Sequence, residues 1–140
     1  MIVKVIDLFC GAGGLTHGLQ LAGLDVVAGI DLEGECRFPY EKNNKSKFIE
    51  KDIAKVTKEE LLKLYGDASI KVLAGCAPCQ PFSKYTQGKD KAEDKKWPLL
   101  YEFERLIREV SPEIVTMENV PDVTKHKVYN DFYYSLLELG

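Results

Sequence analysis

Two cysteines in a short, proline-rich segment are the side chains of this sequence best suited to chemistry. Cys76 and Cys79 are separated by two residues, and Pro78 and Pro81 flank Cys79. Two thiols at this spacing can form half of a zinc site or a redox pair. A zinc site would need a second close pair of ligands, which the remaining cysteines and histidines do not form. A redox pair of the thioredoxin type would lie at the start of a helix. The two prolines instead hold the chain in a constrained loop.

A catalytic nucleophile is the third use of a cysteine, and it suits Cys79 better than the other two. Covalent catalysis requires a sulfur that is fixed in place and partly exposed. The two prolines hold Cys79 in a constrained turn that follows the apolar run 70–74. We therefore predict that Cys79 is a nucleophile at the end of a strand.

A cluster of glycines follows the first apolar run of the chain. Gly11, Gly13 and Gly14 come after a predicted strand and open a helix, so their backbone could approach a ligand near a helix amino terminus. Their spacing differs from the three-glycine dinucleotide fingerprint, and a tight turn without a ligand also explains it. Asp31 ends the second predicted strand, where an acid can accept hydrogen bonds from ribose hydroxyls.

Two further acids are placed at the ends of predicted strands. Asp52 follows the third strand and Glu118 follows the fifth. Open α/β sheets bind ligands at the carboxyl ends of their strands. Taken alone, Asp52 fits a helix cap or a solvent-exposed acid better than a ligand contact. Because neighbouring parallel strands end at one edge, we expect Glu118 to converge on the turn that carries Cys79.

Apolar runs of two kinds alternate along the chain and define the expected elements. Short runs rich in β-branched residues predict strands at residues 2–9, 25–30, 48–49, 70–74 and 112–117. Apolar residues at helical spacing predict helices at residues 15–22, 57–66, 99–110 and 128–139, with a polar helix ending near 43–44. Thr57 and Glu60 match a capping box for the second of these helices. Repeated strand-helix units predict a doubly wound α/β fold with a mainly parallel sheet covered on both faces.

Composition places the chain among single globular domains. Its 140 residues are 45% hydrophobic and 29% charged, which fits one domain with one core. The first apolar stretch is interrupted by Lys4, Asp7, His17 and the glycines, so we expect neither a signal peptide nor a membrane span. We therefore expect a cytoplasmic location. The net charge of −3 gives no general attraction to a polyanion, so any grip on DNA must come from local patches or from another polypeptide.

The remaining cysteines are expected to be structural. In a chain without a secretion signal, cysteines are better explained as reduced thiols than as disulfides. We expect Cys10, Cys36 and Cys76 to be buried. None of them is predicted to bind a metal.

Three segments of the sequence resemble hallmark motifs of the DNA cytosine-C5 methyltransferases. These segments are 7–14, 75–83 and 118–120, and they occur in the order and at the spacing typical of that family. The resemblance extends over nearly the whole chain. It implies the Rossmann-like fold of S-adenosylmethionine-dependent methyltransferases, cut short after about five strands. It also implies transfer of a methyl group from S-adenosylmethionine, with S-adenosylhomocysteine as the product, in DNA methylation of the restriction-modification type.

The resemblance assigns a set of residues to the methyl donor. Asp31 would hold the ribose hydroxyls, Asp52 and Ile53 would flank the adenine, and Leu99 would help to close the pocket. Leu32 stands where the family often has an aromatic residue after the ribose-binding acid. The other residues expected at this pocket are Phe9, Gly11, Gly13 and Gly14.

The resemblance also assigns the catalytic residues. The thiolate of Cys79, between Pro78 and Gln80, would add to C6 of a flipped cytosine and make C5 nucleophilic. Glu118 would hydrogen-bond N3 and the amino group of the base, and Asn119 would help to fix the loop around the site. The lysine-rich segment 83–97 corresponds to a mobile catalytic loop that could contact phosphates.

The family pattern would continue beyond Gly140 with two more strands, an arginine-bearing motif and a target-recognition region. Residues 1–140 are therefore expected to form a partial catalytic domain, whose fifth strand is unpaired on one side. The chain would be a truncated piece or one half of a split enzyme, in which a second polypeptide supplies the rest. Three alternatives remain open: a non-catalytic cofactor-binding or assembly subunit, an RNA cytosine-C5 methyltransferase, and, as the weakest, a nicotinamide-dependent enzyme.

Overall fold

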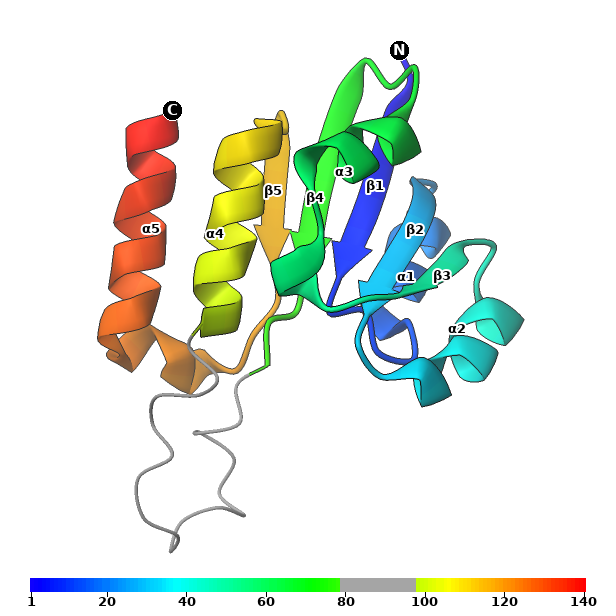
Figure 1. Ribbon diagram of the computed structural model, residues 1–140, viewed down its shortest axis with the longest axis horizontal. Helices are drawn as coiled ribbons and strands as arrows, with labels where there is room; N and C mark the ends of the chain where they lie inside the picture. Colours follow the sequence, from blue (N-terminus) through cyan, green and yellow to red (C-terminus); the bar gives the residue numbers. More distant parts are fainter. Residues whose placement is uncertain (79–97) are drawn as a thin grey trace, which may run out of the picture.

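Five parallel strands form one sheet in the computed structural model, which describes residues 1–78 and 98–140. The strands are β1 (Val3–Leu8), β2 (Asp25–Asp31), β3 (Lys47–Glu50), β4 (Ile70–Gly75) and β5 (Ile114–Met117). Their order across the sheet is β3-β2-β1-β4-β5, and each neighbouring pair is parallel. Figure 1 shows all five arrows running toward the same edge. The prediction of a mainly parallel α/β sheet is confirmed, although β5 begins two residues later than expected, at Ile114.

Helices follow the strands in alternation. They are α1 (Gly14–Leu21), α2 (Arg37–Asn43), α3 (Lys58–Tyr65), α4 (Pro98–Val110) and α5 (Lys127–Leu139). Short 3₁₀ turns that the sequence pattern did not reveal are also present within the described residues, namely η1 (Gly34–Cys36), η2 (Ile53–Lys55) and η4 (Pro121–Lys125). The capping box is confirmed, because Thr57 Oγ1 accepts from Glu60 N at 3.3 Å and Glu60 Oε2 accepts from Thr57 N at 2.9 Å. Within the described ranges, no helix is both long and apolar enough to span a bilayer.

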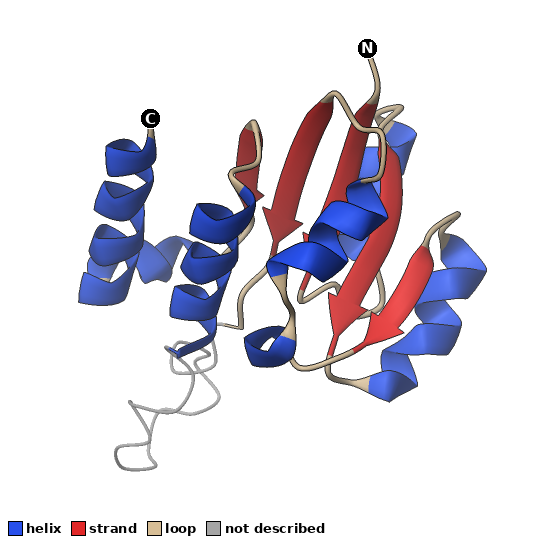
Figure 2. Cartoon of the chain, turned by 45° about the horizontal axis from the view of Figure 1, so that its top comes forward, coloured by secondary structure: helices blue, strands red, loops and turns tan. Residues whose placement is uncertain are grey.

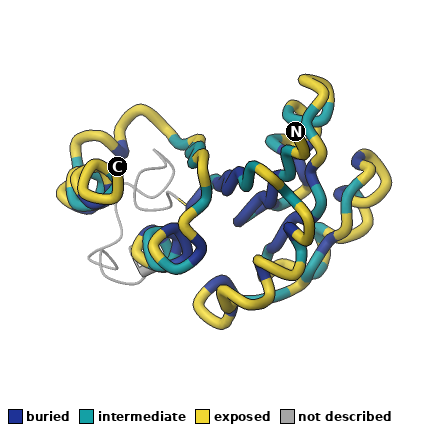
Figure 3. The backbone as a smooth tube through the Cα atoms, turned by 90° about the horizontal axis from the view of Figure 1, so that it is seen from above, coloured by how far each residue is buried: buried dark blue, intermediate teal, exposed yellow. Residues whose placement is uncertain are grey.

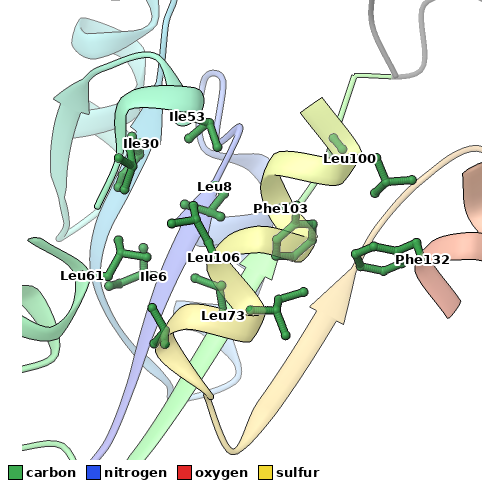
Figure 4. Close-up of a cluster of buried hydrophobic side chains, with 14 of the residues drawn as sticks. Ile6, Leu8, Ile30, Ile53, Leu61, Leu73, Leu100, Phe103, Leu106 and Phe132 are labelled. Atoms are coloured by element: carbon green, nitrogen blue, oxygen red, sulfur yellow. The ribbon is translucent and has the colours of Figure 1, made fainter. Parts of the chain in front are cut away.

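The helices cover both faces of the sheet, as Figures 1 and 2 show. Successive residues of a strand point to opposite faces, so Val5 contributes to one core and Ile6 to the other. The larger core lies under α3 and α4, and Figure 4 shows Leu8, Leu73 and Phe103 meeting there. The smaller core lies under α1.

Helix α5 is placed differently from the other helices. It packs on α4 through Phe132, whose ring centroid lies 5.6 Å from that of Phe103. Figure 3 shows that much of its surface is exposed, and Tyr134 and Leu137 are exposed by 63% and 59%. Among the described residues no strand pairs with the outer edge of β5.

The order of the strands creates a switch point between β1 and β4. From β1 the chain moves outward through β2 to β3, and it then returns to the other side of β1 to form β4 and β5. The chain therefore leaves the neighbouring strands β1 and β4 in opposite directions, toward β2 from β1 and toward β5 from β4. In open parallel sheets, ligands bind in the crevice at such a point, outside the carboxyl ends of the strands.

Candidate functional site

The turns that leave the strands are joined to one another at the carboxyl edge of the sheet. Cys76 N donates to Leu8 O at 3.2 Å, which joins the turn after β4 to the end of β1. Cys10 N donates to Ile30 O at 3.3 Å, and Lys51 N donates to Asp31 O at 2.8 Å. The segments that carry the predicted site residues are thus held side by side by their main chains.

The turn after β1 has an unusual backbone. Phe9, Gly11 and Gly13 have φ angles of 57°, 49° and 91°, which lie in the left-handed region. This conformation suits glycine and is strained for phenylalanine, and such strain is typical of functional turns. The turn is closed by a bond from Gly13 N to Cys10 O at 2.8 Å. The Phe9 ring meets Phe103 of α4 edge-on, with 6.4 Å between the centroids.

The three glycines of this turn have different surroundings. A Cβ atom on Gly11 or Gly14 would meet no other atom within 4 Å. A Cβ atom on Gly13 would collide with the side chains of Asn44 and Tyr40. The open space that close approach of a ligand requires is therefore present at Gly11 and Gly14. At Gly13 the missing side chain makes room for Tyr40 of α2 and for Asn44, and contact of its backbone with a ligand stays a prediction.

Asp31 connects the end of β2 to this turn. Its Oδ2 accepts from Gly11 N at 2.8 Å, and its Oδ1 accepts from Glu33 N at 2.9 Å. Each carboxylate oxygen can accept more than one hydrogen bond, so the group can still receive hydroxyl donors from a ligand. Leu32, the next residue, is 62% exposed, so its side chain is accessible beside the carboxylate.

The other residues expected at the cofactor pocket lie farther along the same edge. Asp52 caps η2, since its Oδ1 accepts from Ala54 N at 3.0 Å. This agrees with the expectation that Asp52, taken alone, is a helix cap. Ile53 is only 3% exposed and belongs to the larger core (Figure 4), so a ligand there would meet its backbone and not its side chain. Leu99 is half-buried in the first turn of α4.

Hydrogen bonds join the turns after β4 and β5. Glu118 N donates to Gly75 O at 3.0 Å, and Asn119 Nδ2 donates to Ala77 O at 3.2 Å. The Sγ atom of Cys76 lies 2.8 Å from Oε2 of Glu118. The expected convergence of the Glu118 segment on the turn after β4 is confirmed as far as Ala77, and Pro78, the next residue, is exposed. Cys79 and Gln80 lie outside the described residues.

The three described cysteines have different environments. Cys10 is buried, as expected, whereas Cys36 and Cys76 are half-buried, so the prediction of buried structural thiols was wrong for these two. Burial and the nearby Asp7 and Asp31 raise the pKa of the Cys10 thiol well above its usual range. Cys10 therefore stays a neutral thiol and is not suited to nucleophilic attack.

A buried polar cluster, which no sequence pattern indicated, lies beneath the glycine turn. Thr16 Oγ1 donates to Asp7 Oδ2 at 2.7 Å and lies 3.1 Å from the Tyr40 hydroxyl, which donates to Ser46 Oγ at 2.9 Å. Burial raises the pKa of Asp7 to about 6 and that of Tyr40 to about 12. An acid in the middle of a buried strand was the signal in the sequence. Its partners, from α1, α2 and the turn before β3, could not be identified from spacing.

Metal binding finds no support in the described ranges. No group of three histidine, cysteine, aspartate or glutamate side chains there is arranged to hold an ion. The side-chain oxygens at the sheet edge that could bind a metal belong to carboxylates, among them Asp31 and Asp52. These carboxylates already accept main-chain hydrogen bonds. The edge therefore offers hydrogen-bond acceptors, open space beside two glycines and a thiol–carboxylate pair.

Comparison with known proteins gives consistent results over nearly the whole chain. The sequence profile of the family described as C-5 cytosine-specific DNA methylase matches residues 3–140. The Type II methylase M.HgiDII of Herpetosiphon aurantiacus is 53% identical over 143 residues, covering all of this chain and 40% of that protein. The Type II methyltransferase M.HgiGI, from the same organism, is 32% identical over 130 residues, covering 91% of this chain and 98% of that protein.

The fold is also similar to a solved structure. The Dnmt2 methyltransferase of S. pombe superposes with a TM-score of 0.75 at 23% identity, covering 96% of this chain and 41% of that one. This likeness supports the fold alone. The chain thus spans about 40% of the length of M.HgiDII and of this structural neighbour.

Proposed function

Because the chain belongs to the C-5 cytosine-specific DNA methylase family, we propose that it carries the catalytic centre of a DNA cytosine-C5 methyltransferase. The observation that carries the proposal is the bond from Glu118 N to Gly75 O at 3.0 Å. This bond fixes the acid that ends β5 against the turn that leads to Cys79. A nucleophile and an acid from neighbouring strands are the two groups that the reaction requires.

The reaction begins at the cytosine. The thiolate of Cys79 adds to C6, forming a carbon–sulfur bond and moving electron density onto N3 and C5. Glu118 accepts from the 4-amino group and shares a proton with N3, which favours the protonated ring and stabilises the charge that develops there, a contribution typically worth about 10²–10⁴-fold. Once C5 carries the methyl group, a base removes the proton that remains on C5, which restores the C5–C6 double bond and expels the thiolate of Cys79. The base must leave the duplex for this chemistry, since its C6 is inaccessible in the stack.

S-adenosylmethionine supplies an electrophilic methyl group when it is bound. The residues at the β1 and β2 ends fit this molecule, because Asp31 can accept from ribose hydroxyls and Gly11 faces open space. Phe9 and Leu32 offer apolar surface beside them, and Asp52 lies farther along the edge. These residues bind and orient the donor on the β1 side of the switch point.

Further polypeptide completes the enzyme in this proposal, either in the same chain or as a second subunit. The chain spans 40% of M.HgiDII, and the outer edge of β5 has no paired strand among the described residues. The added part would read the DNA target and extend the sheet, and the complex would act in the cytoplasm. Methyl transfer by these 140 residues alone would contradict this part of the proposal.

Covalent trapping tests the chemistry directly. DNA containing 5-fluorocytosine at the target should form a stable adduct with the complete protein, because fluorine cannot leave C5 as the proton does. Cys79→Ser should abolish the adduct, and Glu118→Gln should slow its formation. Cys36→Ser is the matched control, because it makes the same thiol-to-hydroxyl change at a half-buried cysteine away from the reacting groups, and it should still form the adduct. A protein that binds S-adenosylmethionine but forms no adduct would instead be a non-catalytic cofactor-binding subunit.

A further inference from the structure

The thiol of Cys76 and the carboxylate of Glu118 form a close polar contact outside the reacting pair. The distance from Cys76 Sγ to Glu118 Oε2 is 2.8 Å. A thiol carries one S–H donor, and a carboxylate oxygen offers lone pairs that accept. The direction of the bond is therefore fixed, and Cys76 donates to Glu118.

The main chain sets the geometry of this contact. The two residues are 42 positions apart in sequence, but each directly follows the last paired residue of its strand, Gly75 on β4 and Met117 on β5. The bonds from Glu118 N to Gly75 O and from Asn119 Nδ2 to Ala77 O lie on either side of it. The thiol and the carboxylate are thus presented to each other by a rigid frame and not by mobile loops.

Glu118 needs such a partner more than a buried acid would. Its side chain is exposed, and the ion pairs found within residues 1–78 and 98–140 do not include it. An exposed glutamate loses a large rotamer entropy when it is ordered. A donor that engages Oε2 restricts this freedom, and the lone pairs that remain on both oxygens stay available to the base.

We infer that Cys76 is a positioning residue, whose S–H group fixes the carboxylate of Glu118 for its contact with the target cytosine. This inference rests on the role proposed for Glu118 above. Cys76 itself touches neither the cytosine nor the methyl donor in this assignment. A serine would retain the donor at this position, whereas an alanine would remove it.

Vibrational spectroscopy tests the hydrogen bond without any turnover. The S–H stretching band lies in a spectral region nearly free of other protein bands, and it moves to lower frequency when the group donates. Cys76→Ser should remove one low-frequency component from the Raman spectrum of the protein. Glu118→Ala should move that same component to higher frequency. An unchanged S–H spectrum in Glu118→Ala would overturn the inference, whatever the activity of the enzyme.

Kinetics then test the consequence in the complete enzyme. Cys76→Ala should lower kcat about fivefold, the factor that corresponds to about 1 kcal/mol of transition-state stabilisation, with the KM for S-adenosylmethionine unchanged. Cys76→Ser should recover kcat to within about twofold of the wild type, since one hydrogen-bond donor replaces another. Cys36→Ala, the matched control, should leave kcat unchanged.

The two hypotheses fail in different ways. If the wild-type protein forms no adduct with 5-fluorocytosine DNA, the proposed function is wrong, whereas the S–H band still reports on the pair. If the adduct forms but Cys76→Ala turns over as fast as the wild type, the positioning role is wrong. Equal loss of kcat in Cys76→Ser and Cys76→Ala would also contradict the positioning role. The hydroxyl donor kept in Cys76→Ser would then make no contribution to kcat.

Discussion

Asp31 accepts a hydrogen bond from the backbone N–H of Gly11 at 2.8 Å, so the end of β2 holds the turn that leaves β1. The other oxygen of the carboxylate accepts from Glu33 N, which fixes the plane of the group. One side chain therefore shapes two neighbouring turns of the candidate donor pocket. Its removal should affect ligand binding more than the overall fold.

Asp31→Ala should weaken binding of S-adenosylmethionine by at least about tenfold, since it removes an acceptor for the ligand and the support of the Gly11 turn. Isothermal titration calorimetry on the complete protein measures the change. Asp25→Ala is the matched control, because Asp25 is an exposed acid at the opposite end of the same strand. Equal affinities of Asp31→Ala and wild type would exclude Asp31 from the pocket.

Gly29→Ala should lower the free energy of unfolding by about 1–3 kcal/mol, because the new methyl group would collide with the buried ring and hydroxyl of Tyr40. Urea unfolding monitored by circular dichroism gives the value. Gly18→Ala is the control, since a Cβ atom there meets nothing within 4 Å and lies inside α1. That change should raise stability by about 0.5–1 kcal/mol. Similar effects of both changes would contradict the packing of Tyr40.

Asp7→Asn should change the pH dependence of stability. Burial raises the pKa of Asp7 from 3.8 to about 6, so the folded protein keeps a proton that the unfolded chain releases in that interval. Stability from this group is present below pH 3.8 and is lost as the pH rises to about 6. Asparagine is neutral throughout, so the variant should gain up to about 3 kcal/mol relative to wild type between pH 4 and pH 8.

Urea unfolding of Asp7→Asn and wild type at both pH values measures this change. Each protein at pH 4 serves as its own control for packing effects of the amide, which do not depend on pH. The difference in unfolding free energy between Asp7→Asn and wild type could also stay the same at the two pH values. That result would show that folding does not raise the pKa of Asp7. The hydrogen bond from Thr16 would then outweigh the effect of burial.

Thr57→Ala should lower the free energy of unfolding by about 1 kcal/mol, because it removes the side-chain oxygen that caps α3. Thermal and urea unfolding both report the loss. Lys58→Ala changes the next residue, which is exposed and takes no part in the capping box, and should have little effect. If the two variants are equally stable, the α3 cap contributes nothing measurable.

Much of the fold follows from local patterns that the sequence displays. The strands were predictable because β-branched runs alternate with helical spacing, and Thr57 with Glu60 marks the start of α3 within one turn. The position of Glu118 at the same edge as the β4 turn follows from parallel strands alone. Parallel order and strand ends therefore locate the candidate site without any knowledge of tertiary contacts.

Contacts between distant residues could not be predicted in this way. Tyr40 fills the space beside Gly13 and Gly29, which lie 27 and 11 residues away, and no spacing rule indicates such a partner. The half-burial of Cys76 has the same origin, because its environment depends on Glu118 from another strand. Cysteine is a residue type that is often buried, so burial was the natural prediction for Cys76. Its position just beyond the end of β4 leaves it half-exposed instead.

The parallel sheet also separates the rim that carries the candidate site from the opposite rim. The turn at residues 66–69 lies at the amino ends of the strands, where Asp67 pairs with Lys4 at 2.7 Å and is 73% exposed. A fluorophore or an affinity handle attached to this turn would sit a full strand length from the ligand-facing turns. The architecture thus provides a built-in anchoring point for surface immobilisation, from which binding of DNA and of the methyl donor could be followed with the opposite rim free.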